Sequence, residues 1–366
     1  MHFILDFTFL MFVFAQATSS ITIQQKTWTW RGHSIAFDYA QSANSDETTR
    51  IDKKTILLLN GFGVGSFHQH RLISELIEQD SSGTIYAVDY LGQGKSWPVD
   101  CQDGLSPQEQ GLQYSADTWL EQLEEFIHVV VKASPHVVGN SVGGHLAVAL
   151  AHRGIPLSSL VLLNATPVWG LNLPGWSGRL PSPKLPKIIG RKLFDWIRDL
   201  ATIEKYLDNA YFHRMAFEGE LPQQIQSCTL GKGAHVAFSS IMWSPPATGK
   251  DWFTQVSELP CDCLVIFGAK DPWCTPTIAK KILEKLPKDI AKRYLELDRV
   301  GHCPNHEAPK AVAAAVTTWM NARDKRTVPF GNQIFSEPWG DITMSEKKSE
   351  DIQINLLDWF AANFVF

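Results

Sequence analysis

The residues best suited to covalent chemistry form the pentapeptide Gly-Asn-Ser-Val-Gly at positions 139–143, with Ser141 at its centre. A short, mostly apolar run at residues 136–138 precedes it, and small apolar residues follow at helical spacing over residues 144–151. A serine between a strand and a helix lies on a sharp turn that exposes its hydroxyl, and the flanking glycines let the two elements approach. The turn also places the Val142 N–H at a helix start, where free amide donors favour negative charge. The pentapeptide therefore predicts a nucleophilic serine, although alone it also occurs in ordinary loops.

A serine hydroxyl is a weak nucleophile at neutral pH and needs a histidine base, which a carboxylate orients. After Ser141, the first acid at the end of a predicted strand is Asp271, and the first histidine after the next strand is His302. Because parallel strands end at the same edge of a sheet, we expect the three side chains to converge. An Asp-Pro turn and a Gly-His loop are each ordinary features by themselves. Together, in the order nucleophile, acid, histidine, they predict a catalytic triad.

Acyl transfer also requires two N–H donors for the oxyanion that forms on the carbonyl oxygen. We predict that the backbone of Val142 provides one, and that Phe62, in the glycine-rich loop after the apolar run 55–59, provides the other. A phosphate-binding role for this loop is rejected because it lacks the Gly-Lys-Ser/Thr ending of a P-loop. Residues 92–94 (Gly-Gln-Gly) likewise lack the third glycine of a dinucleotide fingerprint, so no organic cofactor is expected.

The elements that must position these groups alternate between strands and helices. Such alternation predicts an α/β fold with a mostly parallel central sheet and helices on both faces, preceded here by an antiparallel hairpin. Strands are predicted at residues 26–30, 34–39, 55–59, 84–88, 136–138, 160–163, 263–267 and 293–297, and helices at 70–79, 114–132, 277–286 and 309–322.

The alternation is interrupted at residues 165–251, which are rich in proline at first and then in large apolar residues. We interpret this segment as an inserted helical lid over the carboxyl ends of the strands, where such sheets bind ligands. It divides the core into residues 18–164 and 252–322. Trp169 and Trp243 are predicted to contact substrate, and further candidates for the cavity lining are Trp176, Phe194, Trp196, Phe212, Phe217 and Phe238. Half of these eight could equally form the core of the lid.

Composition narrows the possible partners. The 366-residue chain has a net charge of −5 and no basic cluster, which excludes nucleic acid as an expected partner. Its six cysteines form no CxxC pair and have no histidine partners at zinc spacing, so neither a metal site nor a disulfide framework is expected. Oligomeric state is not determined by the sequence.

The two ends of the chain leave alternatives open. Residues 1–17 are apolar and end in a signal-peptidase-like Ala-Gln-Ala, which predicts a signal or targeting segment. The expected basic start is missing, so a misassigned start or a divergent organelle signal are alternatives. Residues 323–366 are interpreted as a C-terminal extension whose apolar end, from residue 352, packs on the core. Peripheral membrane contact and self-association are the alternatives for it.

Several stretches are more specific than a triad. These are Gly-Phe-Gly-Val-Gly-Ser-Phe-His at 61–68, Leu-Gly-Gln-Gly at 91–94, Gly-Asn-Ser-Val-Gly-Gly at 139–144, Leu-Leu-Asn-Ala-Thr-Pro-Val-Trp-Gly at 162–170, Asp-Pro-Trp at 271–273 and Gly-His-Cys-Pro at 301–304. In these stretches, spread over about residues 55–320, the chain resembles the pheophytinase group of α/β-hydrolases of plants and algae. It departs from that group at Asn60, where proline is usual, at Val142, where leucine is usual, and at Asn305-His306.

The resemblance implies an α/β-hydrolase fold and hydrolysis of the phytyl ester of pheophytin to pheophorbide and phytol. It implies that Ser141, Asp271 and His302 form the triad, that the protein is located in the plastid, and that no metal or organic cofactor is required. The alternatives are an esterase for chlorophyll, an acylglycerol, a thioester or another lipophilic ester, a carbon–carbon hydrolase or lyase that uses the same triad, and a non-catalytic receptor on the same fold.

Overall fold

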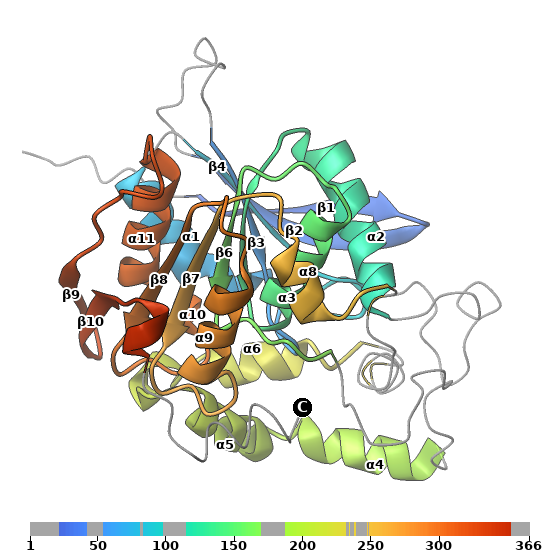
Figure 1. Cartoon of the computed structure of the whole chain (residues 1–366). Helices are drawn as coiled ribbons and strands as arrows, with labels where there is room; N and C mark the ends of the chain where they lie inside the picture. Colours follow the sequence, from blue (N-terminus) through green and yellow to red (C-terminus); the bar gives the residue numbers. More distant parts are fainter. Residues whose placement is uncertain are drawn as a thin grey trace, which may run out of the picture.

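The computed structural model describes residues 22–41, 54–80, 83–97, 115–169, 187–231, 234, 238, 247 and 249–352. Within these residues a single sheet runs in the order β1-β2-β4-β3-β5-β6-β7-β8-β10-β9 (Figure 1). The pairs between β4 and β8 are parallel, whereas the hairpins at both edges are antiparallel. The α/β fold predicted from the alternation of strands and helices is confirmed.

Most of the central strands are apolar runs that are buried on both faces of the sheet. Those of the parallel part are β3 (Thr55–Leu59), β4 (Thr84–Val88), β5 (His136–Asn140), β6 (Ser159–Leu163), β7 (Cys263–Gly268) and β8 (Lys292–Leu297). Successive residues of each strand belong to opposite cores. In β3, for example, Leu57 and Leu59 pack on one face of the sheet, and Ile56 and Leu58 pack on the other.

Helices cover both faces of the sheet. One core contains residues of α1 (His70–Gln79) and α11 (Pro309–Asn321). The other contains residues of α2 (Ala116–Phe126), α3 (Val142–His152), α8 (Trp252–Ser257) and α9 (Pro276–Lys285). The predicted helix at 114–132 is divided, because α2 continues as a π-helical turn over Ile127–Val131.

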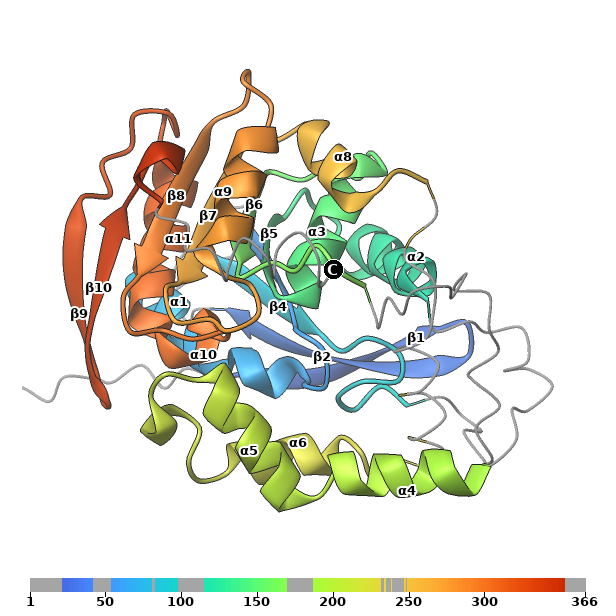
Figure 2. The same cartoon turned by 60° about the horizontal axis from the view of Figure 1, so that its bottom comes forward.

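Among the described residues, the cap between β6 and β7 contains the helices α4 (Lys187–Ile197), α5 (Leu200–Ala210) and α6 (Leu221–Ser227). Both views place them together beyond one end of the strands (Figures 1 and 2). They have a small core of their own, made by Ile203, Leu207, Ala210, Tyr211, Ala216, Phe217 and Leu221. The boundaries of a lid at residues 165–251 remain a prediction, since residues 170–186 and most of 232–248 lie outside the described residues.

The edges of the sheet are two hairpins. The first, β1 (Gln24–Trp30) with β2 (His33–Gln41), agrees with the sequence analysis. The second, β9 (Asn332–Glu337) with β10 (Gly340–Glu346), pairs with β8 and was not predicted. It shows that the first part of the C-terminal extension belongs to the core. Residues 1–17 and the apolar end from residue 353 lie outside the described residues, and no described helix has the length and apolar character needed to cross a membrane.

Candidate active site

The Ser141 turn is imposed by close backbone packing. Ser141 lies between β5 and α3 with φ 55° and ψ −119°, a conformation that L-residues rarely adopt. A Cβ on Gly139 would overlap the Gly143 carbonyl, and one on Gly143 would overlap the Leu59 carbonyl. Only glycine fits at either position, so the close crossing of strand and helix requires both glycines of the pentapeptide.

Hydrogen bonds join this turn to its neighbours. The Ser141 N–H donates to the Leu163 carbonyl at 2.9 Å. The side-chain amide of Asn140 donates to the same carbonyl at 3.2 Å and to the carbonyl of His302 at 2.9 Å. Asn140 therefore joins the serine turn to the histidine loop. The Gly-x-Ser-x-Gly pattern does not predict this role, because it allows any residue at position 140.

Asp271 and His302 are paired. The His302 Nδ1 lies 2.7 Å from Asp271 Oδ2, and the carboxyl is buried. Its other oxygen accepts the backbone N–H groups of Trp273 and Cys274 at 2.8 and 3.0 Å. Burial alone would raise the pKa of Asp271, but the His302 imidazole and these hydrogen bonds outweigh it and hold the pKa below its usual value. The carboxylate is therefore charged at neutral pH and can orient the imidazole.

Asn164 completes the environment of the carboxylate. Its Nδ2 donates to Asp271 Oδ2 at 2.6 Å, and its Oδ1 accepts the Gly268 N–H at 2.9 Å. The residue follows β6 with φ 42°, a left-handed conformation that asparagine tolerates better than most residues. The sequence analysis did not identify this role, because nothing local marks an asparagine whose partner lies more than one hundred residues away.

Within the described chain, Ser141 Oγ makes no hydrogen bond with His302. Both side chains line the same cavity of about 630 Å³. Catalytic hydrogen bonds are often long before substrate binds and shorten in the complex. The structure thus brings Ser141 and His302 to one cavity, and it places Asp271 behind His302, buried and in contact with the imidazole.

The predicted oxyanion donors also lie at this cavity. Val142 is the first residue of α3, and Phe62 follows β3. Among the described residues, neither backbone N–H donates to a protein acceptor. The next N–H in the β3 loop, that of Gly63, donates to Gln93 Oε1 at 2.7 Å, which fixes the loop to the one after β4.

The cavity lies between the core and the cap, and its lining is mainly apolar. Trp169 lines it as predicted, and so do Phe194, Trp196 and Phe238. The predictions for Phe212 and Phe217 were wrong: Phe217 is buried in the cap core, and Phe212 is exposed away from the cavity. Trp176 and Trp243 lie outside the described residues. Lining aromatic residues that the sequence analysis did not name are Trp97, Trp119, Tyr206 and Trp273.

The sequence profile of the alpha/beta hydrolase family matches residues 56–315. The chain belongs to this family. It is 28% identical over 309 residues to the chloroplastic pheophytinase of Arabidopsis thaliana, an alignment that covers 74% of this chain and 62% of that protein. It is also 26% identical over 287 residues to the proline iminopeptidase of Clostridioides difficile (strain 630), over 74% of this chain and 91% of that protein.

Solved structures agree on the fold of this α/β-hydrolase. The meta-cleavage product hydrolase from Pseudomonas fluorescens IP01 superimposes with a TM-score of 0.59 at 17% identity, covering 81% of this chain and 97% of that one. The chain therefore spans less than two thirds of the pheophytinase that it resembles but nearly the full length of the smaller hydrolases.

In this α/β-hydrolase the cap is bonded directly to the histidine loop. The His302 N–H donates to the carbonyl of Ala210, the last residue of α5, at 2.7 Å. Glu307 accepts the Gly301 N–H at 2.7 Å with one carboxylate oxygen and the His213 N–H at 2.6 Å with the other. Burial raises the pKa of Glu307 to about 7. The position of His302 thus depends on the cap as well as on the core.

A second buried polar cluster lies behind the site. Tyr211 bridges two histidines, with its hydroxyl 2.8 Å from His68 Nε2 and 3.1 Å from His306 Nδ1. The two imidazoles are stacked with centroids 4.8 Å apart. Burial lowers the pKa of His68 to about 3, so this cavity-lining imidazole is neutral at physiological pH. Its contacts tie the 61–68 loop to the cap and to the segment after His302.

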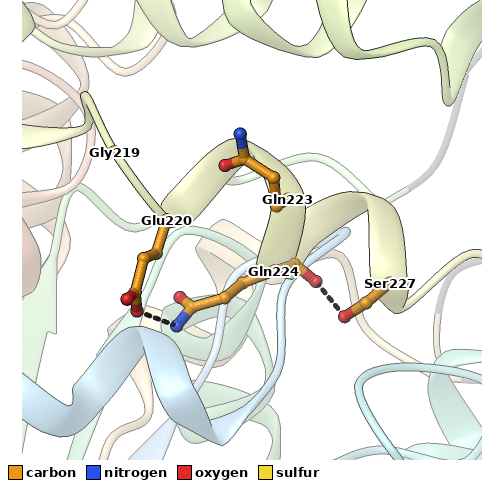
Figure 3. Close-up of a pocket in the computed structure, with 5 residues that line it drawn as sticks. All are labelled: Gly219, Glu220, Gln223, Gln224 and Ser227. Carbon is orange, nitrogen blue, oxygen red and sulfur yellow. Dashed lines mark hydrogen bonds between the residues drawn. The ribbon is translucent and has the colours of Figure 1, made fainter.

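Two other features of the α/β-hydrolase do not form separate sites. Among the described residues, one group could in principle hold a metal ion, with ligand atoms of Asp271, Cys274 and His302 within 4.8 Å of one another. Burial raises the pKa of the Cys274 thiol well above its usual value, and a neutral thiol is a poor ligand. A hollow on α6 is lined by Gly219, Glu220, Gln223, Gln224 and Ser227. There the Gln224 amide donates to the Glu220 carboxylate, and the Ser227 hydroxyl donates to the Gln224 carbonyl (Figure 3).

Proposed function

We propose that the protein is a serine hydrolase that cleaves a carboxylic ester of a large lipophilic substrate, with the phytyl ester of pheophytin as the preferred candidate. The observation that carries the proposal is His302, which is paired with Asp271 at 2.7 Å and lines the same apolar cavity as Ser141, a serine held in a strained turn. A buried, charged carboxylate on Nδ1 leaves Nε2 as the basic nitrogen, as general-base catalysis requires.

In the proposed mechanism, His302 Nε2 takes the Ser141 proton as Ser141 Oγ attacks the ester carbonyl. The resulting oxyanion is held by the N–H groups of Phe62 and Val142, each worth about 3–4 kcal/mol in the transition state. His302 then gives the proton to the leaving alcohol, and an acyl-enzyme remains on Ser141. Water activated by His302 releases the acid, while Asp271 keeps the imidazole oriented and stabilises its protonated form.

The lining supports a neutral lipophilic ester. None of the described residues that line the cavity is an aspartate or a glutamate, and Arg198 is the one side chain among them with a permanent charge. An iminopeptidase must bind the free amino group of its substrate, and the described lining provides no carboxylate for that group. The ester hydrolase is therefore favoured over an aminopeptidase, although relatives of both kinds match this chain.

Pheophytin is preferred because the Arabidopsis relative is named a pheophytinase and because the motifs at 61–68, 162–170 and 301–304 all line or support this cavity. The same relative is named as chloroplastic, which supports a plastid location. Entry into the secretory pathway is the alternative that residues 1–17 leave open. Import of a fluorescent fusion into isolated chloroplasts, compared with a fusion that starts at residue 18, tests the location.

Purified protein incubated with pheophytin, chlorophyll, p-nitrophenyl acetate and a proline arylamide tests the function. We expect pheophorbide from pheophytin, no arylamide turnover, and loss of all activity in Ser141→Ala. Brisk aryl-ester turnover without pheophorbide would remove pheophytin and leave an esterase of another specificity. A fluorophosphonate probe that fails to label wild-type protein at Ser141 would favour the non-catalytic receptor.

Peripheral contact with a lipid surface is also proposed, because a lipophilic ester resides in membranes. Its support is the exposure of Leu193 and Trp196 on α4, with Trp196 both 63% exposed and part of the cavity lining. Sedimentation with phosphatidylglycerol vesicles, reduced in Trp196→Ser, tests it. Wild-type protein that stays in the supernatant would contradict this contact.

A further inference from the structure

We infer that the two halves of the ester occupy opposite ends of the cavity, with the acyl group among the tryptophans near β4 and the alcohol along α5 beside His302. This inference rests on the proposed serine hydrolase and assigns orientation and specificity within its site. It makes Trp97 a specificity residue for the acyl half and Leu207 one for the alcohol half.

The order of the strands separates the two ends. Along the carboxyl edge, the loops follow the order β4, β3, β5, β6, β7, β8. Ser141 follows β5, so the loop that carries Phe62 and the loop that carries Trp97 lie on one side of it. Trp273 and His302, which follow β7 and β8, lie on the other side.

The direction of proton transfer determines which end of the cavity binds the alcohol and which binds the acyl group. The leaving alkoxide must receive the proton that His302 holds, so the alcohol oxygen lies on the His302 side of Ser141. The carbonyl oxygen points to the N–H groups of Phe62 and Val142. The acyl chain is bonded to the same carbon and points in a third direction, away from both His302 and the N–H groups. It therefore lies against the part of the lining on the β3 and β4 side.

The β3 and β4 side of the cavity is formed by tryptophan rings that neighbouring residues hold in place. The Trp97 indole donates to the Gly94 carbonyl at 3.1 Å, and its ring lies so close to Gly231 of the cap that a Cβ there would come within 2.5 Å. Trp169 follows β6, but its ring packs edge-on to Trp119 at 5.2 Å, and the Trp119 indole donates to the Leu91 carbonyl in the β4 loop. These contacts place the Trp169 ring at the β4 end of the cavity. Rigid, flat surfaces suit a planar conjugated acyl group, which stacks on them at little entropic cost.

The other end is largely aliphatic. The side chains of Ile203 and Leu207 are buried on the face of α5 that lines the cavity, and Ile278 of α9 also lines it. One wall is aromatic: Trp273 packs edge-on to His302 at 4.9 Å, and Tyr206 stacks on Trp273 at 4.9 Å. Trp273 thus packs against the imidazole and Tyr206 covers Trp273, while the aliphatic residues offer a flexible alcohol chain a surface without directional demands.

A pair of reversed esters tests the orientation with the wild-type chain alone. Dodecyl 1-pyrenebutyrate has a flat aromatic acyl group and an aliphatic alcohol, and 1-pyrenebutyl dodecanoate contains the same two halves with the ester reversed. We expect kcat/KM for the first to exceed that for the second by about tenfold or more, since pocket contacts of this kind discriminate by such factors. Equal values, or a preference for the second ester, would overturn the inference.

Two variants then assign the ends. Trp97→Ala is expected to lower kcat/KM for methyl 1-pyrenebutyrate about tenfold more than for dodecyl acetate, and Leu207→Ala is expected to do the opposite. Leu230→Ala, an exposed cap position outside the lining, controls for substitution in the cap. The opposite pattern would show that the orientation is inverted. If none of these esters is turned over and a fluorophosphonate leaves Ser141 unlabelled, the proposed function itself fails.

Discussion

Ser141 and its two partners are held in place by different kinds of force. The serine turn is set by steric exclusion, because Gly139 and Gly143 press against backbone carbonyls and leave room for no other residue. Asp271 and His302 are set by hydrogen bonds that Asn164 and Asn140 donate to them and by one that the His302 N–H donates to the Ala210 carbonyl of the cap. Steric requirements appear in the local sequence as glycines at fixed spacing. Hydrogen-bonded positions depend on residues distant in the chain and have no local signature.

The largest effect is expected where a hydrogen-bonded position is changed without a change in volume. Asp271→Asn removes the charge that orients His302 and stabilises its protonated form, so kcat should fall by about 10⁴-fold. Steady-state kinetics with a short aryl ester measure it, and circular dichroism checks that the fold is kept. A loss below about tenfold would mean that Asp271 is not the acid of the triad.

Gly143→Ala tests the sterically fixed position. Its methyl group would overlap the Leu59 carbonyl in the sheet, so the free energy of unfolding should fall by about 3 kcal/mol. Gly154→Ala is the matched control. Gly154 has φ 82° with nothing near its Cβ position, so this change adds backbone strain alone and should lower the free energy of unfolding by about 1 kcal/mol. Equal losses in urea denaturation would refute the steric account of the turn.

Asn164→Gly separates orientation from packing. Glycine accepts the left-handed φ of this residue, so the change removes the amide without adding strain there. Asp271 Oδ2 loses one of its two partners, and we expect kcat to fall about tenfold with KM little changed. Wild-type kcat in this variant would show that the His302 contact and the two backbone N–H groups suffice to hold the carboxylate.

The last prediction concerns the pH dependence that Glu307 gives to stability, because this residue joins the histidine loop to the cap. Its pKa of about 7 in the folded chain exceeds the ordinary value of 4.5, so the folded state binds its proton more tightly than the unfolded state does. That contribution to stability is complete below about pH 4.5 and is lost as pH rises through 7. Relative to Glu307→Gln, the wild type should therefore lose unfolding free energy between pH 5 and 8. Urea denaturation at several pH values measures these free energies. The same change with pH in both proteins would contradict the prediction.

The sequence predicted the parallel core well, because its strands are buried apolar runs and its helices keep one apolar face. The hairpin formed by β9 and β10 was missed, since its strands are largely polar and are stabilised by pairing with β8. Phe212 and Phe217 were misassigned because composition does not distinguish the interior of a cap from the lining of a cavity. The triad could be proposed from order and loop position. Asn164 and Glu307 could not, since their partners are known only once the chain is folded.

The hydrogen bond from His302 to Ala210 has a consequence for exchanging parts between hydrolases. A cap taken from another member of the family would have to reproduce a carbonyl at that point, or the His302 loop would lose this hydrogen bond. The C-terminal end of α5 and Tyr211 would therefore have to be kept together with the His302 loop. A graft limited to α4 would alter the lining at Phe194 and Trp196 while leaving the hydrogen bond between His302 and Ala210 in place.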